Sequence, residues 1–237
     1  MNISQQVYRV LTKRKYNRNK PYLAGEILKI IDKSLSLNEP IKLVGFWGVG
    51  QKDKPNWADE ESCKFLYDLN KEIKNVYEPG IEFTFVFANM HGQHNGYQKE
   101  SINSYTKGMI KIFNRYSFTY VYLDKLWEKY QITFDKINLI LEAKPEKWWD
   151  EILERDAIEK NAACRNKKYP PRIAAQKYYI MRNLEKEIFE KEFPGYIFHA
   201  FSDPRLQIVL PNMPTLYFYG RESWSNAPWF VDHKKMT

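Results

Sequence analysis

The sequence predicts an α/β protein: a Rossmann-like mixed sheet flanked by helices, with added helices and a C-terminal antiparallel portion. Short apolar segments alternate with amphipathic segments through the first half of the 237-residue chain, the order that builds a sheet covered by helices. The apolar segments 41–47 and 81–88 are also joined by one long helical segment. This arrangement is typical of a βαβ unit, whose ligands sit beyond the carboxyl ends of the strands.

Three helices are predicted before the second strand. Segments 3–13 and 22–34 carry apolar residues at helical spacing, and Pro40 breaks the chain ahead of the first strand. Acidic residues open the segment 58–77, where they favour the positive end of a helix dipole. Pro79-Gly80 ends that helix. The regular alternation indicates that this half of the chain forms the core of the sheet.

The rest of the chain is predicted to add one strand, several helices and a C-terminal portion. A helix over 98–116 precedes a third strand, 119–123, which is rich in β-branched and aromatic residues. Residues 124–195 are predicted to be helical, with a long helix over 171–193. Short apolar segments then follow at 196–201, 207–210 and 216–219. Proline-containing breaks separate them, so we expect antiparallel hairpins there.

The chain is expected to form a single domain, because no stretch has the composition of a linker. Its expected parts are an N-terminal helical segment (1–38), a βαβ core (39–123), a helical segment (124–195) and C-terminal strands (196–237). Two cysteines far apart in sequence, Cys63 and Cys164, do not form a disulfide framework. No apolar run is long enough for a membrane span or a signal peptide. We therefore expect a cytoplasmic protein with no membrane partner.

The net charge of +8 raises the question of a nucleic-acid partner. The basic run 13–20 has the composition of a phosphate-binding surface. It is equally typical of a solvated turn between helices. Because much of the excess is gathered in this region instead of spreading along the chain, we do not expect nucleic acid to be the partner.

Polar segments follow the first two predicted strands, and both carry groups suited to an anionic small molecule. In the loop 89–97, Gly92 and Gly96 let a ligand approach the backbone closely, and the start of the next helix favours phosphate or carboxylate. His91 and His94 titrate near neutral pH, so they are candidates for moving protons. The alternative is a surface turn with two solvated histidines. Two loop histidines without a cysteine cluster do not define a metal site, so we expect no metal and no cofactor.

The loop 48–57 and the C-terminus add further candidates. Lys52 follows the first strand, where a lysine can attack a carbonyl or hold phosphate as a point charge; it can also be a solvated loop residue. Arg221 lies in a segment with Trp229, and an arginine beside tryptophan rings can bind an anion while the rings wall a cavity. A strand that simply packs on the core is the competing interpretation.

The segment 77–97, YEPGIEFTFVFANMHGQHNGY, resembles the isocyanide (isonitrile) synthases of the pyoverdine/dityrosine biosynthesis family. Tyr77 and Pro79-Gly80 match the turn with which the family enters a strand, and Tyr105 matches a tyrosine in the following helix. The preceding loop with lysines and the acidic helix start at Asp59-Glu60 are similar as well. The sequence departs from the family where Asn89-Met90-His91-Gly92 replaces a Ser-Asp-Gly loop, so it resembles a divergent member. Phe230 also stands where the family has histidine.

The resemblance implies a small-molecule biosynthetic enzyme of secondary metabolism. Such enzymes condense the amine of an amino acid, often tyrosine or tryptophan, with ribulose 5-phosphate or a similar phosphorylated ketose, and then fragment the adduct. The partners expected here are thus an amino acid and a sugar phosphate; the oligomeric state is left open. The expected catalytic residues are Lys52, His91 and His94. The expected substrate-binding residues are Trp47, Asn89, Gly92, Gly96, Tyr97, Arg221 and Trp229.

Two other functions remain open from the sequence. The same polar loops suit another Rossmann-like transferase that binds a nucleotide or an activated metabolite. The basic first part of the chain suits an RNA-binding module.

Overall fold

The computed structural model describes residues 2–49, 52–200, 210, 212–219 and 230. At its centre is a five-stranded sheet in the order β3-β2-β1-β4-β5, and every strand pairing among the described residues is parallel. The strands are β1 (Ile41–Trp47), β2 (Ile81–Phe87), β3 (Thr119–Tyr122), β4 (Ile197–Ala200) and β5 (Thr215–Tyr217). Because the strands are parallel, their carboxyl ends meet at one edge of the sheet.

Strand β1 lies in the middle of the sheet and is apolar on both faces. It pairs with β2 along its whole length, from Ile41 opposite Ile81 to Trp47 opposite Phe87, and with β4 on its other side. Side chains alternate between the two faces of a strand, so Trp47 belongs to one apolar core and Phe46 packs against the other. Burial on both faces explains why β1 and β2 are nearly continuous apolar runs.

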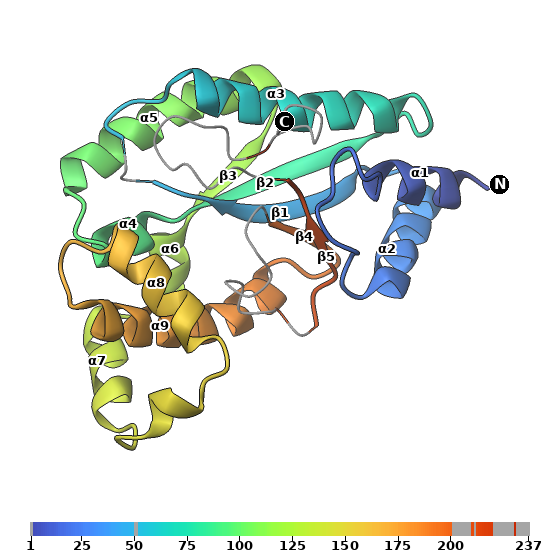
Figure 1. Ribbon diagram of the computed structural model, residues 1–237. Coiled ribbons are helices and arrows are strands. Elements are labelled where there is room, and N and C mark those ends of the chain that lie inside the picture. Colours follow the sequence, from blue (N-terminus) through green and yellow to red (C-terminus); the bar gives the residue numbers. More distant parts are fainter. Residues whose placement is uncertain (1, 50–51, 201–209, 211, 220–229, 231–237) are drawn as a thin grey trace.

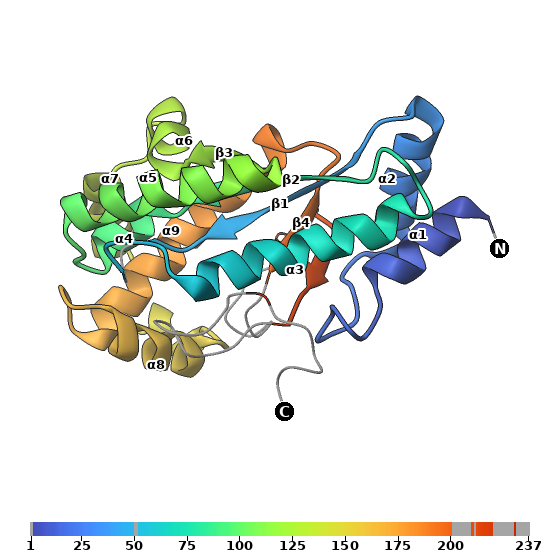
Figure 2. The same cartoon turned by 90° about the horizontal axis from the view of Figure 1, so that it is seen from above.

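Helices cover both faces of the sheet (Figures 1 and 2). The Trp47 face packs against α3 (Trp57–Lys74) and α5 (Lys99–Tyr116), and α1 (Ile3–Leu11) and α2 (Ala24–Leu37) extend the same core at the amino end of the strands. The Phe46 face packs against the second group of helices. That group consists of α6 (Leu123–Lys129), α7 (Phe134–Glu142) and α9 (Pro171–Glu192).

Three shorter elements complete the carboxyl edge and its surroundings. Helix α4 (Asn89–His94) follows β2 directly. Helix α8 (Arg155–Arg165) packs along α9, and the 3-10 turn η1 (Trp148–Glu151) precedes it. Figure 1 shows α4 and α8 at the opposite end of the molecule from α1 and α2. Candidate ligand-binding elements therefore gather at one end of the molecule.

The α/β class, with a sheet flanked by helices, is confirmed. The antiparallel C-terminal portion needs a correction, because β4 and β5 pair in parallel. Antiparallel contacts do occur there, but they join β5 and its neighbour to the N-terminal segment, at Tyr22 with Thr215 and at Asn17 with Phe218. Most of the predicted strand 207–210 lies outside the described residues. Within the part of the chain that the structure describes, no helix is both long and apolar enough to cross a bilayer.

The segment 89–97 was predicted to be a loop and is largely helical. Its first six residues form α4, and the backbone N–H of Gly92 donates to the carbonyl of Ala88 at 3.0 Å. The two glycines and the polar composition suggested a loop. Within this helix Gly92 lies close to the first loop: a side-chain carbon at that position would come within 3.2 Å of the Val49 carbonyl oxygen.

Gly45 on β1 offers a test of this packing. A Cβ atom there would come within 2.5 Å of Cε1 of His199 and 2.7 Å of the His199 backbone oxygen. We expect Gly45→Ala to lower the free energy of unfolding by about 1–3 kcal/mol, as overpacking does. Gly25, near the start of α2, has nothing within 4 Å of such an atom. Gly25→Ala should therefore be neutral or slightly stabilising, by up to about 1 kcal/mol. Urea denaturation of both variants measures the difference; equal stabilities would contradict this packing.

Candidate functional site

The candidate site lies where β1 ends, and it contains a buried carboxylate on each face of the sheet. Asp59 lies on the Trp47 face and Glu185 on the Phe46 face, and both side chains have 0% exposure. We call the residues around the first acid the Asp59 cluster: Trp47, Lys52, Asn56, Asp59 and Tyr105. We call those around the second acid the Glu185 cluster: His91, Trp127, Arg182 and Glu185.

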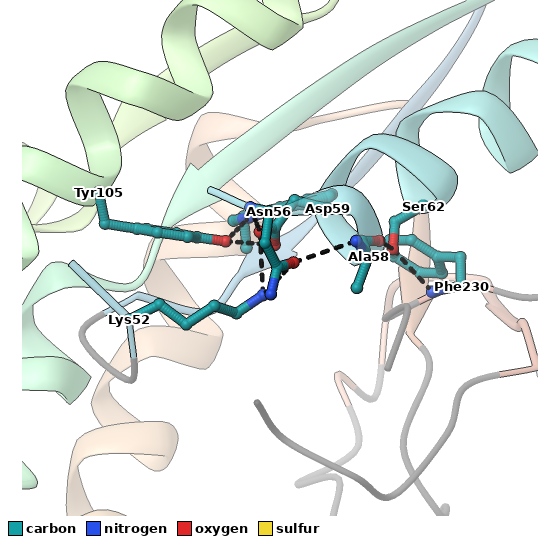
Figure 3. Close-up of polar contacts among 8 residues, drawn as sticks. Lys52, Asn56, Ala58, Asp59, Ser62, Tyr105 and Phe230 are labelled. Carbon is teal, nitrogen blue, oxygen red and sulfur yellow. Dashed lines mark hydrogen bonds and ion pairs between the residues drawn. The ribbon is translucent and has the colours of Figure 1, made fainter. Parts of the chain in front are cut away.

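Hydrogen bonds connect every member of the Asp59 cluster, and Figure 3 shows those among Lys52, Asn56, Asp59 and Tyr105. One carboxylate oxygen of Asp59 accepts from the hydroxyl of Tyr105 at 2.6 Å, and that hydroxyl accepts from Nε1 of Trp47 at 3.0 Å. The other oxygen accepts from Nζ of Lys52 at 2.9 Å and from the backbone N–H of Asn56 at 2.8 Å. The Lys52 side chain is 11% exposed, so it lies at the edge of the buried network.

The start of α3 fixes this geometry. Asn56 is the N-cap, and its side-chain oxygen accepts from the backbone N–H of Ala58 at 3.0 Å and from Nζ of Lys52 at 3.1 Å. Asp59, three residues on, returns a bond to the backbone of Asn56, which completes a capping box. A capping interaction thus holds the carboxylate that pairs with Lys52. In chemical terms, an ammonium, a carboxylate and a phenol in series can hand a proton along the network.

The Glu185 cluster surrounds a buried carboxylate with nitrogen donors from three elements. One oxygen of Glu185 lies 2.8 Å from Nε2 of His91 on α4 and 3.1 Å from Nε1 of Trp127 on α6. The other accepts from Nη1 of Arg182 at 2.8 Å. The ring of Phe46, at the end of β1, contacts two of these partners: its centroid lies 5.3 Å from that of His91 and 4.5 Å from Cζ of Arg182.

The charge of Glu185 sets the tautomer of His91. Burial alone would raise the pKa of this carboxyl, but His91 and Arg182 beside it outweigh burial and hold the pKa below its usual range. Glu185 is therefore an ionised acceptor, so Nε2 of His91 must carry the proton in that hydrogen bond. Nδ1 then lies on the other side of the ring, away from this carboxylate. A carboxylate that orients an imidazole in this way is the arrangement of a histidine general base.

The other histidine of α4, His94, has a different role. It is 2% exposed, and its Nε2 lies 3.1 Å from the carbonyl oxygen of Ala174. Burial, which outweighs that hydrogen bond, lowers the pKa of His94 to about 4. The ring is thus neutral at physiological pH and ties α4 to α9. This placement favours a structural role over the predicted proton transfer.

The backbone of 89–97 is not the open anion cradle that we predicted. The N–H groups of Gly92, Gly96 and Tyr97 donate to the carbonyls of Ala88, Gln93 and Gly92. The side-chain oxygen of Asn89 accepts from the backbone N–H groups of Met90 and Asp124 at 3.1 Å each, so it joins α4 to α6. These groups are already used within the fold, because the segment is helical.

The structure places Lys52 and His91 in different clusters on opposite faces of the sheet. The two loops themselves adjoin, as the approach of Gly92 to Val49 shows. Trp47 lies in the Asp59 cluster as a 1% exposed residue that bonds Tyr105. Arg221 and Trp229 lie outside the described residues. The predicted pair of basic side chains around one anion is replaced by two basic side chains, Lys52 and His91, each held by its own buried acid.

Sequence reasoning missed Glu185, Arg182 and Trp127. One signal was present: Glu185 falls on the apolar stripe of the long helix, four residues after Met181 and three before Ile188, which are both buried. A charged residue in such a stripe is a candidate for a buried, paired role. The family resemblance singled out Asp59 and Tyr105, but nothing in the sequence showed that these two side chains form a hydrogen bond with each other.

Two further expectations concern partners. The basic run 13–20 packs onto α3, where Nζ of Lys13 and Nζ of Lys15 lie 2.7 and 2.9 Å from the carboxylate of Glu72. That a nucleic acid is not the partner remains a prediction. In the described ranges, no group of three His, Cys, Asp or Glu side chains is arranged to hold a metal ion.

Comparison with known proteins extends the fold assignment. Neither a family model nor a curated protein matches this sequence. The PvcA protein from Pseudomonas aeruginosa has a similar structure, with a TM-score of 0.63 and 17% identity over 97% of this chain and 88% of PvcA. Tyrosyl-tRNA synthetase from Leishmania major, in complex with tyrosinol, has a TM-score of 0.56 and 12% identity over 93% of this chain and 32% of the synthetase. Tyrosyl-tRNA synthetase from Aeropyrum pernix has a TM-score of 0.56 and 11% identity over 98% of this chain and 68% of the synthetase. At these identities the likeness establishes a shared α/β fold.

Glu185→Gln tests the Glu185 cluster. The substitution removes the negative charge that pairs with Arg182. It also places an amide N–H₂ donor against groups that themselves donate to Glu185, so we expect a loss of about 3–5 kcal/mol in the free energy of unfolding. Glu187→Gln, on the same helix, changes a 79% exposed side chain whose partner Lys191 is 3.8 Å away. It should cost less than about 1 kcal/mol. Chemical denaturation measures both; equal small losses would show that the buried pairing is not formed.

The low pKa of His94 predicts a pH dependence of stability. The folded value of about 4 lies below the ordinary 6.5, so the unfolded chain takes up the proton first as the pH falls. Stability is therefore full above pH 6.5 and falls as the pH drops toward 4, by about 3 kcal/mol from this group. His94→Gln should flatten the curve by that amount, while His199, whose pKa burial lowers to about 3, keeps its own contribution. Unfolding curves at pH 7 and 4 check this; an unchanged difference in His94→Gln would refute it.

Proposed function

We propose that this protein is a small-molecule biosynthetic enzyme similar to the isocyanide synthases, which condenses the amine of an amino acid with a phosphorylated ketose and fragments the adduct. The observation that carries the proposal is the Asp59 cluster. Three features of the family resemblance, namely the lysine loop, the acidic helix start and the helix tyrosine, meet there as Lys52, Asp59 and Tyr105 within hydrogen-bond distance. They meet at the end of the central strand, where α/β enzymes bind ligands.

The fold comparisons support the same proposal. The likeness to PvcA extends over 97% of this chain and 88% of PvcA, so it is not confined to a shared βαβ unit. The Leishmania major synthetase was solved with tyrosinol, the alcohol that corresponds to tyrosine. A related fold therefore accommodates an aromatic amino-acid analogue, which suits an amino-acid substrate for this chain.

The first chemical step assigns roles to the clusters. The substrate amine must lose its extra proton, add to the ketone carbon and lose two more protons, while the carbonyl oxygen takes up two protons and leaves as water. Lys52 is the partly exposed cation of the Asp59 cluster, and we assign the proton transfers at the amine to Lys52 with Tyr105. His91, oriented by Glu185, is a base for the sugar side of the reaction. The later fragmentation leaves one sugar carbon on the amine nitrogen.

A second candidate function is favoured by the likeness to two synthetases. In this alternative the chain is a transferase that binds a nucleotide or another activated metabolite. Thermal-shift measurements against nucleotides, sugar phosphates and amino acids separate the two, since a ligand that binds the folded state raises its apparent stability. Stabilisation by nucleotides but not by sugar phosphates would favour the transferase.

The direct test is incubation of the purified protein with ribulose 5-phosphate and a panel of amino acids. The proposal predicts a product with the infrared band of an isocyanide and consumption of both substrates, with tyrosine and tryptophan as the first amino acids to examine. If no amino acid is consumed and no sugar phosphate stabilises the protein, the proposal fails.

Tyr105→Phe tests the Asp59 cluster in that reaction. It deletes the hydroxyl that joins Trp47 to Asp59, so we expect turnover to fall by about 100-fold or more. Tyr116→Phe is a matched control on the same helix, because its hydroxyl contacts Glu60 at 2.8 Å, outside the cluster. Turnover should be within about twofold of the wild type in the control. Rates are compared for samples whose folded fraction is equal by circular dichroism; equal rates in the two variants would remove Tyr105 from the mechanism.

A further inference from the structure

A pocket of about 310 Å³, counted out to the solvent at its mouth, lies between α4, α8 and α9. Its polar lining consists of His94, Asn95, Asn161, Arg165 and Tyr178, and none of its eight lining residues is acidic. Most of this space is open to the solvent, so the enclosed part is far smaller than a typical ligand pocket. It suits one small group of a larger molecule.

The lining of this pocket carries a positive charge and free hydrogen-bonding groups. Burial lowers the pKa of Arg165 to about 10, so its guanidinium stays protonated at neutral pH. The side-chain amide of Asn161 and the hydroxyl of Tyr178 form no hydrogen bond with the described residues. Both can donate to a ligand. An anion with several acceptor oxygens matches this set of groups.

Three lysines lie near residues of this lining and add to its positive potential. The backbone N–H of Lys167 donates to Asn95 at 2.9 Å, which fixes this lysine beside the lining. The charges of Lys177 and Lys168 both act on His94 to lower its pKa, so they lie near it as well. We call Lys167, Lys168 and Lys177 the basic rim.

Aromatic rings, and no carboxylates of the described chain, hold the basic rim. Nζ of Lys167 lies 5.1 Å from the ring centre of Tyr97, and those of Lys168 and Lys177 lie 5.2 and 4.0 Å from that of Tyr169. A ring face attracts an ammonium group but carries no net charge to neutralise it. The rim therefore keeps its charge available, unlike Lys13 and Lys15, which pair with Glu72.

The pocket adjoins the Glu185 cluster. Tyr178 lines the pocket, and its ring packs edge-on against the ring of His91 with centroids 5.5 Å apart. A ligand anchored by an anionic group in the pocket would extend its neighbouring atoms toward this histidine.

We propose that this pocket and its basic rim bind the phosphate group of a phosphorylated small-molecule substrate. The inference rests on the proposed function for the identity of that substrate, the phosphorylated ketose. It gives the phosphate a place in α4, α8 and α9 instead of the backbone of 89–97. It also puts the sugar carbons beside His91, on the Phe46 face of the sheet.

Isothermal titration calorimetry tests the site without requiring turnover. We expect the wild type to bind ribulose 5-phosphate and, more weakly, inorganic phosphate, and to bind unphosphorylated ribulose at least about tenfold more weakly than its phosphate. The variant Lys167→Gln/Lys168→Gln/Lys177→Gln should lose at least about tenfold in affinity for ribulose 5-phosphate. The control Lys33→Gln/Lys107→Gln/Lys111→Gln removes the same charge from exposed lysines elsewhere and should bind as the wild type does.

A second variant, Asn161→Asp, places a carboxylate in the pocket and should abolish phosphate binding while the thermal unfolding midpoint stays close to that of the wild type. Retention of wild-type affinity in both variants, or equal affinity for ribulose and its phosphate, would overturn the assignment. The assignment would also be overturned if the protein bound single-stranded RNA with a steep salt dependence and did not bind the sugar phosphate.

The two proposals fail separately. Phosphate binding that is lost in the rim variant, in a protein that makes no isocyanide, would keep the site and reject the proposed reaction. Isocyanide formation with an unchanged KM for the sugar phosphate in both variants would keep the reaction and reject the site.

Discussion

Two carboxylates without exposed surface impose the main constraint on this structure. A buried, ionised carboxylate is strongly unfavourable unless N–H and O–H donors surround it. Asp59 obtains them from the lysine loop, the start of α3 and α5, and Glu185 obtains them from α4, α6 and its own helix. Each acid therefore fixes the relative positions of elements that are far apart in the sequence. Because both acids lie at the end of β1, this constraint also builds the candidate site.

The parallel sheet explains why the two clusters have different chemistry. Adjacent residues at the end of β1 point to opposite faces, so Trp47 enters the cluster with a lysine and a phenol, and Phe46 enters the one with a histidine and an arginine. The first set suits proton transfer at an amine. The second set, with the basic pocket beside it, suits an anionic sugar. The proposed two-substrate condensation would use both sides of this strand end.

Much of the fold could be predicted from the sequence, and less of the site. The periodicity of α3, α5 and α9 and the apolar runs of β1 and β2 determine those elements, because burial on one or two faces leaves a regular pattern. Helix α4 could not be predicted, since it is short and contains Gly92. The bond between His91 and Glu185 joins residues 94 positions apart. Such a contact depends on how α9 packs on the sheet, and the periodicity of the sequence does not predict that packing. Asp59 was predicted as a favourable helix start, and its second role with Lys52 became visible only in three dimensions.

The central claim is that the end of β1 binds a phosphorylated substrate beside His91, and histidine side-chain NMR tests it most directly. In ¹⁵N-labelled protein, addition of ribulose 5-phosphate should shift the ring signals of His91 and His94, which lie at the site, and leave those of His199 unchanged. His199 is enclosed by the rings of Phe83, Phe85 and Phe218 on the opposite face. If the signals of His91 and His94 do not move at concentrations that saturate the protein, or if only the His199 signals move, the site described for this protein is wrong.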